Sequence, residues 1–437
     1  MPQSPSDTAQ ELEVPPSEHP PSAMRRTIAT RTASALVVAV GSILVVMPIV
    51  GTPYLSDDLI NRLMPSWLAK PPRTHLYFIW QNNLAWMRQV HRFFPGAIAL
   101  STYVFSTFTT RVSYKVFLVV LLVAVLTAFA GWVGRAAGPT AALMAAAALV
   151  ACWELRYTVT YDGLTGFSGL VPWTMLLIAA VMALFVRRPA RPRWSAVVLI
   201  VGAALWLLAV CTYEYAVILA PSVIASCWLQ SNDRRWRTFT SAIVGVMALA
   251  ALAVAGLLHL HARGPVPPEW ALSLRPGAWT LTTAKQLVSA LPLSEYWIRA
   301  GGSPHVHLSV IVAVAAGVLA VVVAWSLVHQ WRSWDVGATQ SFRRLGLIGA
   351  WFWIAPALLT GATLRWQLVE TWGQSYIPVL FETFGVSLVV VSLLGGARCR
   401  VRGAEHWPGY VATALLVVVG IAIALTAALN FSMVEPS

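Results

Sequence analysis

ASALVVAVGSILVVMPIV, residues 33–50, is an unbroken apolar run that directly precedes GTPYLSDDLINR, residues 51–62. Arg25, Arg26 and Arg31 stand before the run, an arrangement that is typical of signal peptides. The run is longer than the apolar region of a signal peptide, however, and no small-x-small cleavage site follows it. We therefore expect an uncleaved first membrane span that delivers residues 51–62 to the opposite membrane surface.

Composition extends this prediction to the rest of the chain. Of the 437 residues, 58% are hydrophobic and 11% are charged, whereas about 25% of the residues of an average soluble protein are charged. Ten further apolar runs lie near residues 116–134, 139–156, 168–186, 195–212, 214–229, 239–260, 308–329, 346–361, 377–395 and 410–430. The sequence thus predicts an all-α integral membrane protein with about eleven transmembrane helices, joined by extracytoplasmic surface helices.

The first 31 residues differ from the rest. Residues 1–24 are rich in Pro, Ser and Glu and hold few large apolar side chains, which predicts disorder. We expect residues 1–31 to be a disordered cytoplasmic tail and residues 32–437 to form one multi-spanning domain.

Arginine clusters predict the orientation of the spans. They lie at Arg135, Arg187, Arg188, Arg191, Arg193, Arg234, Arg235, Arg237, Arg332, Arg343, Arg344, Arg398, Arg400 and Arg402. Residues 93–110 form a shorter apolar run that is interrupted by Pro95 and Gly96. The arginine clusters all lie on the same side of the membrane as the N-terminus only if this run does not cross the membrane. Because cytoplasmic loops are enriched in Arg and Lys, we expect residues 93–110 to form an interfacial helix on the outer surface.

This orientation places nine of the seventeen acidic residues at outer span ends or in outer loops. These nine are Asp57, Asp58, Glu154, Asp162, Glu214, Glu269, Glu295, Glu370 and Glu382. Two outer loops are long, residues 51–115 and 261–307, and function is expected there and outside the cytoplasm.

Charge and cysteine usage exclude other classes of protein. The net charge of +13 is spread over short clusters between apolar runs, which argues against a nucleic-acid partner. Cys152, Cys211, Cys227 and Cys399 have neither disulfide nor metal-ligand spacing. Only three of the 30 basic residues are lysines, a composition that favours a GC-rich bacterial genome and hence a bacterial inner membrane.

The adjacent carboxylates of Asp57 and Asp58 are the sharpest candidate site. Acidic side chains beside a membrane are costly unless they are solvated, paired or bound to a cation, so they indicate function. A structural interpretation is equally open: Ser56 or Asp57 caps a short helix that begins near Asp58, and Arg62 pairs with Asp58 one turn later.

The order of these features resembles the GT-C glycosyltransferases, and among them the protein O-mannosyltransferases. In those enzymes an acidic pair after the first span precedes a surface helix, a descending span, a polar stretch that contains an Asp, and an arginine-rich turn. The corresponding features here are Asp57 with Asp58, residues 91–110, the span that ends at Arg135, residues 153–162, and Arg187. QSYIP, residues 374–378, resembles the Arg-Tyr-x-x-Pro motif of that group, with Gln in place of Arg.

The resemblance implies transfer of a sugar from a polyprenyl-phosphate donor to an extracytoplasmic glycan, lipid or protein. Asp57 is then the first candidate for the general base and Asp58 the second, and a divalent cation held by the pair is an open alternative. Candidate substrate-binding residues are Arg62, His91, Arg92, Asp162, Glu214, Arg299, His305, Arg365 and Tyr376. Arg299, Arg365, His305 and His307 would meet the phosphate, although interfacial snorkelling is an alternative for Arg299 and Arg365. Asp162 and Glu214 would line the sugar site or form structural pairs.

Two other functions remain open. In a lipid-linked sugar or polysaccharide transporter, the outer acids would serve gating or coupling. In a glycan polymer ligase, residues 261–307, with Arg263, Arg275 and Arg299, would carry the chemistry.

Overall fold

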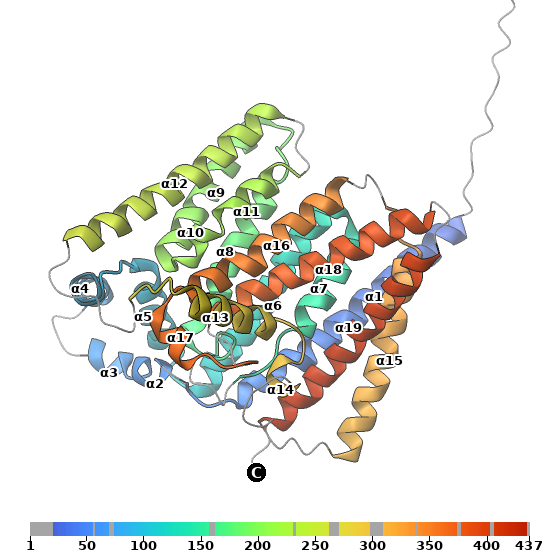
Figure 1. Ribbon diagram of the computed structural model, residues 1–437, viewed down its shortest axis with the longest axis horizontal. Helices are drawn as coiled ribbons and strands as arrows, with labels where there is room; N and C mark the ends of the chain where they lie inside the picture. Colours follow the sequence, from blue (N-terminus) through green and yellow to red (C-terminus); the bar gives the residue numbers. More distant parts are fainter. Residues whose placement is uncertain are drawn as a thin grey trace, which may run out of the picture.

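The computed structural model describes residues 21–55, 57–69, 74–156, 162–229, 233–261, 271–297, 309–336, 340–373, 377–402 and 406–434. These residues form helices joined by short connections, and the described part of the chain contains no β-strand (Figure 1). Leu272 and Thr363 form one isolated antiparallel bridge. The prediction of an all-α membrane protein is confirmed at this level.

Nine helical segments of the described residues are long and apolar enough to cross a bilayer. The helices that supply them are α1 (Pro21–Val46, continued by the 3-10 turn η1, Met47–Gly51), α6 (Arg111–Ala137), α8 (Leu170–Phe185), α9 (Pro192–Thr212), α12 (Arg234–His261), α15 (Val310–Arg332), α16 (Gln340–Gly361), α18 (Val379–Arg402) and α19 (Trp407–Ser432). Each overlaps one of the predicted apolar runs along most of its length.

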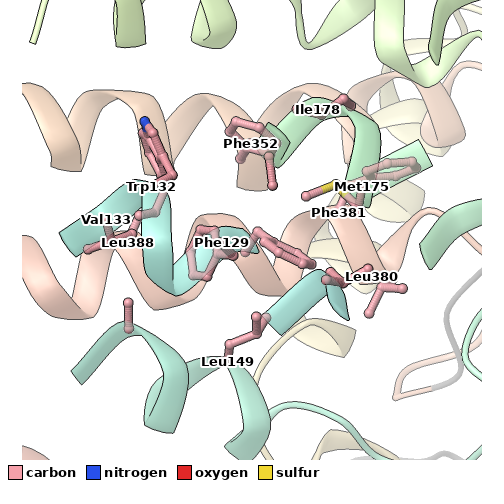
Figure 2. Close-up of a cluster of buried hydrophobic side chains, with 14 of the residues drawn as sticks. Phe129, Trp132, Val133, Leu149, Met175, Ile178, Phe352, Leu380, Phe381 and Leu388 are labelled. Carbon is pink, nitrogen blue, oxygen red and sulfur yellow. The ribbon is translucent and has the colours of Figure 1, made fainter. Parts of the chain in front are cut away.

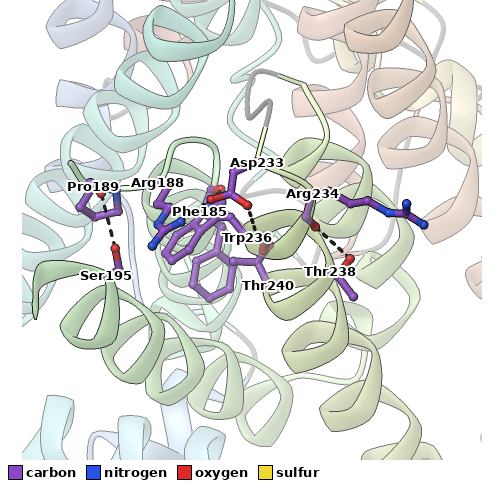
Figure 3. Close-up of polar contacts among 9 residues, drawn as sticks. All are labelled: Phe185, Arg188, Pro189, Ser195, Asp233, Arg234, Trp236, Thr238 and Thr240. Carbon is purple, nitrogen blue, oxygen red and sulfur yellow. Dashed lines mark hydrogen bonds and ion pairs between the residues drawn. The ribbon is translucent and has the colours of Figure 1, made fainter. Parts of the chain in front are cut away.

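One end of these helices gathers the arginine clusters, and we call it the arginine end. There Arg135 donates to the carbonyl of Ala183, Arg187 to the carbonyl of Arg135, Arg344 to the carbonyl of Trp228, and Arg398 to the carbonyl of Trp334. Figure 3 shows Arg188 paired with Asp233, which also caps the first turn of α12 through the Trp236 amide. The predicted grouping of basic loops is thus present in the fold.

The opposite end holds eight of the nine acids predicted to lie together: Asp57, Asp58, Glu154, Asp162, Glu214, Glu295, Glu370 and Glu382. We call it the acidic end. Glu269 lies outside the described residues. At this end α1 finishes and α6 begins, and the described helices between them lie at this end too (Figure 1).

The two remaining predicted spans, 139–156 and 214–229, are shorter than expected. Helix α7 (Pro139–Ala151) has 13 residues, or about 20 Å at 1.5 Å per residue, against about 30 Å of bilayer hydrocarbon. The second is split into α10 (Tyr215–Ile218) and α11 (Ala220–Cys227). Both segments still carry the chain between the two ends. The last residue of α7, Ala151, accepts a hydrogen bond from the Thr426 hydroxyl near the acidic end, and Trp228, which follows α11, accepts one from Arg344 at the arginine end. The count of eleven therefore stays a prediction.

Short helices cover the acidic end. They are α2 (Asp58–Asn61), α3 (Met64–Leu68), α4 (His75–Val90), α5 (Pro95–Thr107), α13 (Pro276–Ser289), α14 (Ser294–Trp297) and α17 (Leu364–Val369). Helix α5 lies against the end of α9 so closely that a Cβ on Gly96 would approach the Thr212 Cα to 2.9 Å. This location agrees with the expectation that residues 93–110 do not cross the membrane.

The core lies around α18, which packs against α7, α8, α16 and α19, and 72% of the residues in its most apolar stretch are buried. Phe129 of α6 meets Phe384 of α18 edge to face, with ring centroids 4.8 Å apart. Figure 2 shows further large side chains converging on the same region, among them Trp132, Leu149, Met175, Phe352 and Phe381. Helices α16 and α18 cross with almost no space between their backbones, since a Cβ on Gly385 would collide with the Trp353 amide and the Gly349 carbonyl.

Candidate functional site

The acidic pair lies in a short turn between α1 and α2. Helix α2 begins at Asp58, and Asp57 occupies the N-cap position with helical torsion angles and no side-chain capping bond. The two carboxylates consequently point to different surroundings, Asp57 being exposed and Asp58 having no exposed surface.

Both carboxylate oxygens of Asp58 are engaged by other elements. The Tyr114 hydroxyl of α6 donates to Oδ2 at 2.6 Å, and the Ser168 amide donates to Oδ1 at 2.9 Å. Burial raises the pKa of Asp58 to about 6, although these two hydrogen bonds favour the ionised form. A buried carboxylate with both oxygens occupied is poorly placed to take a proton from a substrate, so the interpretation of Asp58 as a second base is not supported by its geometry.

Arg62 does not form the one-turn pair with Asp58 that the structural interpretation of the sequence required. Its backbone amide closes α2 on the Asp58 carbonyl, while its guanidinium lies 6.0 Å from the ring centroid of Tyr54. The Tyr54 ring in turn stacks on Tyr114 with centroids 5.8 Å apart. Arg62 is exposed, so it remains beside the acidic turn as a cation without an ion pair among the described residues.

Asp57 is the accessible carboxylate of the pair. Its side chain forms no hydrogen bond with any described residue. Partial desolvation raises its pKa, and the nearby guanidinium of Arg365 opposes that rise. Arg365 belongs to α17 and also lies 5.3 Å from the ring centroid of Trp366. The charge of Arg365 thus acts on the Asp57 carboxylate, so the fold places these two residues singled out in the sequence within electrostatic range of each other.

Asp162 opens a tight turn beside this pair rather than facing open space. Its oxygens accept from the Leu164 amide at 2.9 Å, the Thr165 hydroxyl at 2.6 Å and the Arg156 amide at 3.2 Å. The Lys115 ammonium, which is fully buried, donates to the Thr165 carbonyl. These contacts support the structural alternative for Asp162, and they do not support a sugar-lining role.

Glu154 and Arg156 link the same region to α13 and α14. Glu154 accepts from the amides of Ser294 and Glu295 at 3.0 and 2.8 Å, and Arg156 donates to the Ser289 carbonyl at 2.6 Å. Burial raises the pKa of Glu154 to about 7, against the opposing effect of the Arg156 charge. Both side chains are buried and serve packing between connections at the acidic end.

Glu214 and Arg92 form an ion pair that joins the α4–α5 corner to the junction of α9 and α10. Arg92 also lies 4.4 Å from the ring centroid of Phe94. His91 closes α4 in a left-handed conformation, with its ring 6.1 Å from that of His259 on α12. The ion pair gives Arg92 and Glu214 a structural role, although the second carboxylate oxygen of Glu214 is buried without a hydrogen-bond partner. No described contact brings His91 to Asp57.

Three candidate residues, Arg299, His305 and Tyr376, lie outside the described residues. Sequence reasoning missed Tyr114 and Ser168, which hold Asp58. Tyr114 carries a weak signal, since it lies just before the predicted span 116–134, while Ser168 carries none.

The described residues contain no group of three or more His, Cys, Asp or Glu side chains that would suit a metal ion. No protein-family model matches the chain, and no curated protein matches its sequence.

Proposed function

We propose that the protein is a membrane glycosyltransferase that moves a sugar from a polyprenyl phosphate to an acceptor outside the cytoplasm. The observation that carries this proposal is the exposed Asp57 carboxylate at the acidic end, within electrostatic range of the Arg365 guanidinium. The order of acidic turn, surface helices and spans, which resembles the GT-C enzymes, supports the same reaction. In this proposal the protein resides in a bacterial inner membrane with the acidic end outside, and the acceptor is a cell-envelope glycan, a glycolipid or a protein.

The two groups have complementary roles in such a transfer. Asp57 takes the proton from the acceptor hydroxyl while the oxygen forms a bond to the anomeric carbon of the sugar. The bond between that carbon and the phosphate oxygen breaks, and the polyprenyl phosphate leaves with the electron pair. Arg365 stabilises the negative charge that develops on the phosphate, because a guanidinium can offer it two parallel hydrogen bonds.

A divalent cation is not needed for this assignment. The oxygens of Asp58 already accept two hydrogen bonds, so a cation shared by the pair would have to displace Tyr114 or the Ser168 amide. If chelators abolish transfer, the cation alternative gains support and the role of Arg365 has to be shared with the metal.

The test is transfer of a labelled sugar from polyprenyl phosphate by purified protein in nanodiscs. Asp57→Asn keeps the shape and removes the proton acceptor, so transfer should fall by about 100-fold or more. Arg365→Ala should cost roughly 1.5–3 kcal/mol of phosphate interaction, whereas Asp233→Asn, at the arginine end, is the matched control and should leave transfer unchanged. Full activity in Asp57→Asn would refute the proposal and leave the transporter or ligase alternatives ahead.

A further inference from the structure

The turn that meets Asp58 has an unusual backbone. Phe167, Ser168 and Gly169 have successive φ values of 56°, 56° and 73°, in the left-handed region that side chains disfavour. Strain of this kind persists only where the surrounding structure imposes it, and it is found most often at functional sites. Here it aims the Ser168 amide at Asp58 Oδ1, 2.9 Å away.

The first turn of α6 holds the same carboxylate from the other side. A capping box formed by Thr110 and Ser113 fixes the start of this helix, and Tyr114 follows one residue later with no exposed surface. Its hydroxyl reaches Asp58 Oδ2 at 2.6 Å. The next residue, Lys115, donates to the Thr165 carbonyl and so fastens the strained turn to α6.

Asp58, which accepts the hydrogen bonds from Tyr114 and Ser168, is joined directly to Asp57 by a peptide bond. Asp57 itself has no hydrogen bond from a described residue that would hold its carboxylate, so its direction is set by the backbone that it shares with Asp58. The turn that follows Asp162 packs closely against Asp58, because a Cβ on Gly166 would lie 3.7 Å from Asp58 Oδ2 and 3.3 Å from the Asp162 carbonyl oxygen.

We propose that Asp58, Tyr114 and the Ser168 amide are positioning residues that orient the Asp57 carboxylate toward the acceptor. The proposal rests on the function assigned to Asp57 above. It places Asp58 outside the chemistry: its carboxylate receives two hydrogen bonds and exchanges no proton with the substrate.

Kinetics of transfer separate positioning from chemistry at Asp58. Asp58→Asn keeps an acceptor for the Ser168 amide and offers its own amide to the Tyr114 oxygen, so kcat should stay within about 5-fold of wild type. Asp58→Ala removes both contacts and should lower kcat by about 10-fold or more, with little change in the KM for the donor. A loss in Asp58→Asn as large as that in Asp57→Asn, or full activity in Asp58→Ala, would overturn the proposal.

A second measurement does not depend on turnover. In a variant whose four native cysteines are replaced, the rate at which an Asp57→Cys thiol reacts with a methanethiosulfonate reagent reports the exposure and direction of side chain 57. Adding Tyr114→Phe, which retains the ring and lacks only the hydroxyl, should change that rate by about 3-fold or more. Tyr410→Phe, an exposed tyrosine of α19 far along the chain, is the control and should not change it.

The two measurements distinguish the possible failures. An unchanged thiol reactivity in Tyr114→Phe would refute positioning by this hydroxyl. A changed reactivity in a protein that transfers no sugar would uphold the positioning of residue 57 and refute the proposed transfer. If Asp58→Ala does not fold, the kcat of Tyr114→Phe is compared with wild type instead, because this change removes only the hydrogen bond from the Tyr114 hydroxyl to Asp58.

Discussion

Replacing Asn430 of α19 should weaken the fold more than any other single polar change at the acidic end. This fully buried amide uses its whole hydrogen-bonding capacity. Its Nδ2 donates to the carbonyls of Val45 and Trp153 at 2.9 and 3.0 Å, and its Oδ1 accepts from the Leu155 amide and the Tyr296 hydroxyl at 2.9 and 3.0 Å. One side chain thus ties the end of α1, residues 153–155 and α14 to α19, the last helix.

The size of the effect follows from these four contacts. Hydrogen bonds contribute about 0.6 kcal/mol each on average within membrane helix bundles and up to about 1.5 kcal/mol in soluble proteins. Asn430→Leu, which has a similar volume and no polar atoms, should therefore lower the free energy of unfolding by about 2–6 kcal/mol. The loss should fall toward the upper end because backbone groups are left buried without partners.

Thermal or denaturant unfolding of purified protein in detergent measures this loss. The matched control is Thr413→Val on the same helix, which removes only a local hydrogen bond to the Gly409 carbonyl and should cost less than about 0.5 kcal/mol. If Asn430→Leu is no less stable than Thr413→Val, Asn430 does not connect these elements and the reasoning is wrong.

Three further outcomes are expected. Gly385→Ala should destabilise the protein by about 1–3 kcal/mol, because its Cβ would force α16 and α18 apart, whereas Gly396→Ala on the same helix meets nothing within 4 Å and should be neutral in the same unfolding assay. Burial raises the pKa of Asp58 to about 6 and that of Glu154 to about 7, so the folded state binds these two protons more tightly than the unfolded chain. The melting temperature should therefore fall as pH rises from about 5 to 8. A melting temperature that rises over this range would contradict the burial of these two carboxyls. With native cysteines replaced, Leu274→Cys should react with an impermeant thiol label on intact cells and Arg191→Cys should be shielded, and the reverse pattern would invert the proposed orientation.

The sequence predicted the positions of the long helices well because an apolar run is a local property. The same reasoning overestimated the lengths of α7 and of the segment that became α10 and α11. Helix α7 is alanine-rich and almost wholly buried among other helices, and hydropathy cannot distinguish a segment surrounded by protein from one surrounded by lipid. Pro221 lies inside the second segment, and a proline there removes a backbone donor and interrupts the helix.

The candidate site was predictable only in part. The adjacency of Asp57 and Asp58 identified the turn, and arginines in outer loops suggested phosphate contacts. Which carboxylate is buried depends on Tyr114 and Ser168, which are 56 and 110 residues further along the chain. No spacing rule connects positions so far apart, so the sequence kept Asp58 as the second candidate for the base and did not show that its carboxylate is buried.

The helices also differ in how much protein holds them. In the most apolar stretch of α18, 72% of the residues are buried, whereas in that of α12 only 11% are, so most of this α12 stretch is open to the surrounding bilayer. When a helix in contact with lipid tilts, it exchanges one apolar neighbour for another and loses little free energy. Helix α12 should therefore tilt more easily than α18. Its acidic end carries His259, whose ring lies 6.1 Å from that of His91, so a tilt of α12 would act on the corner where α4 turns into α5.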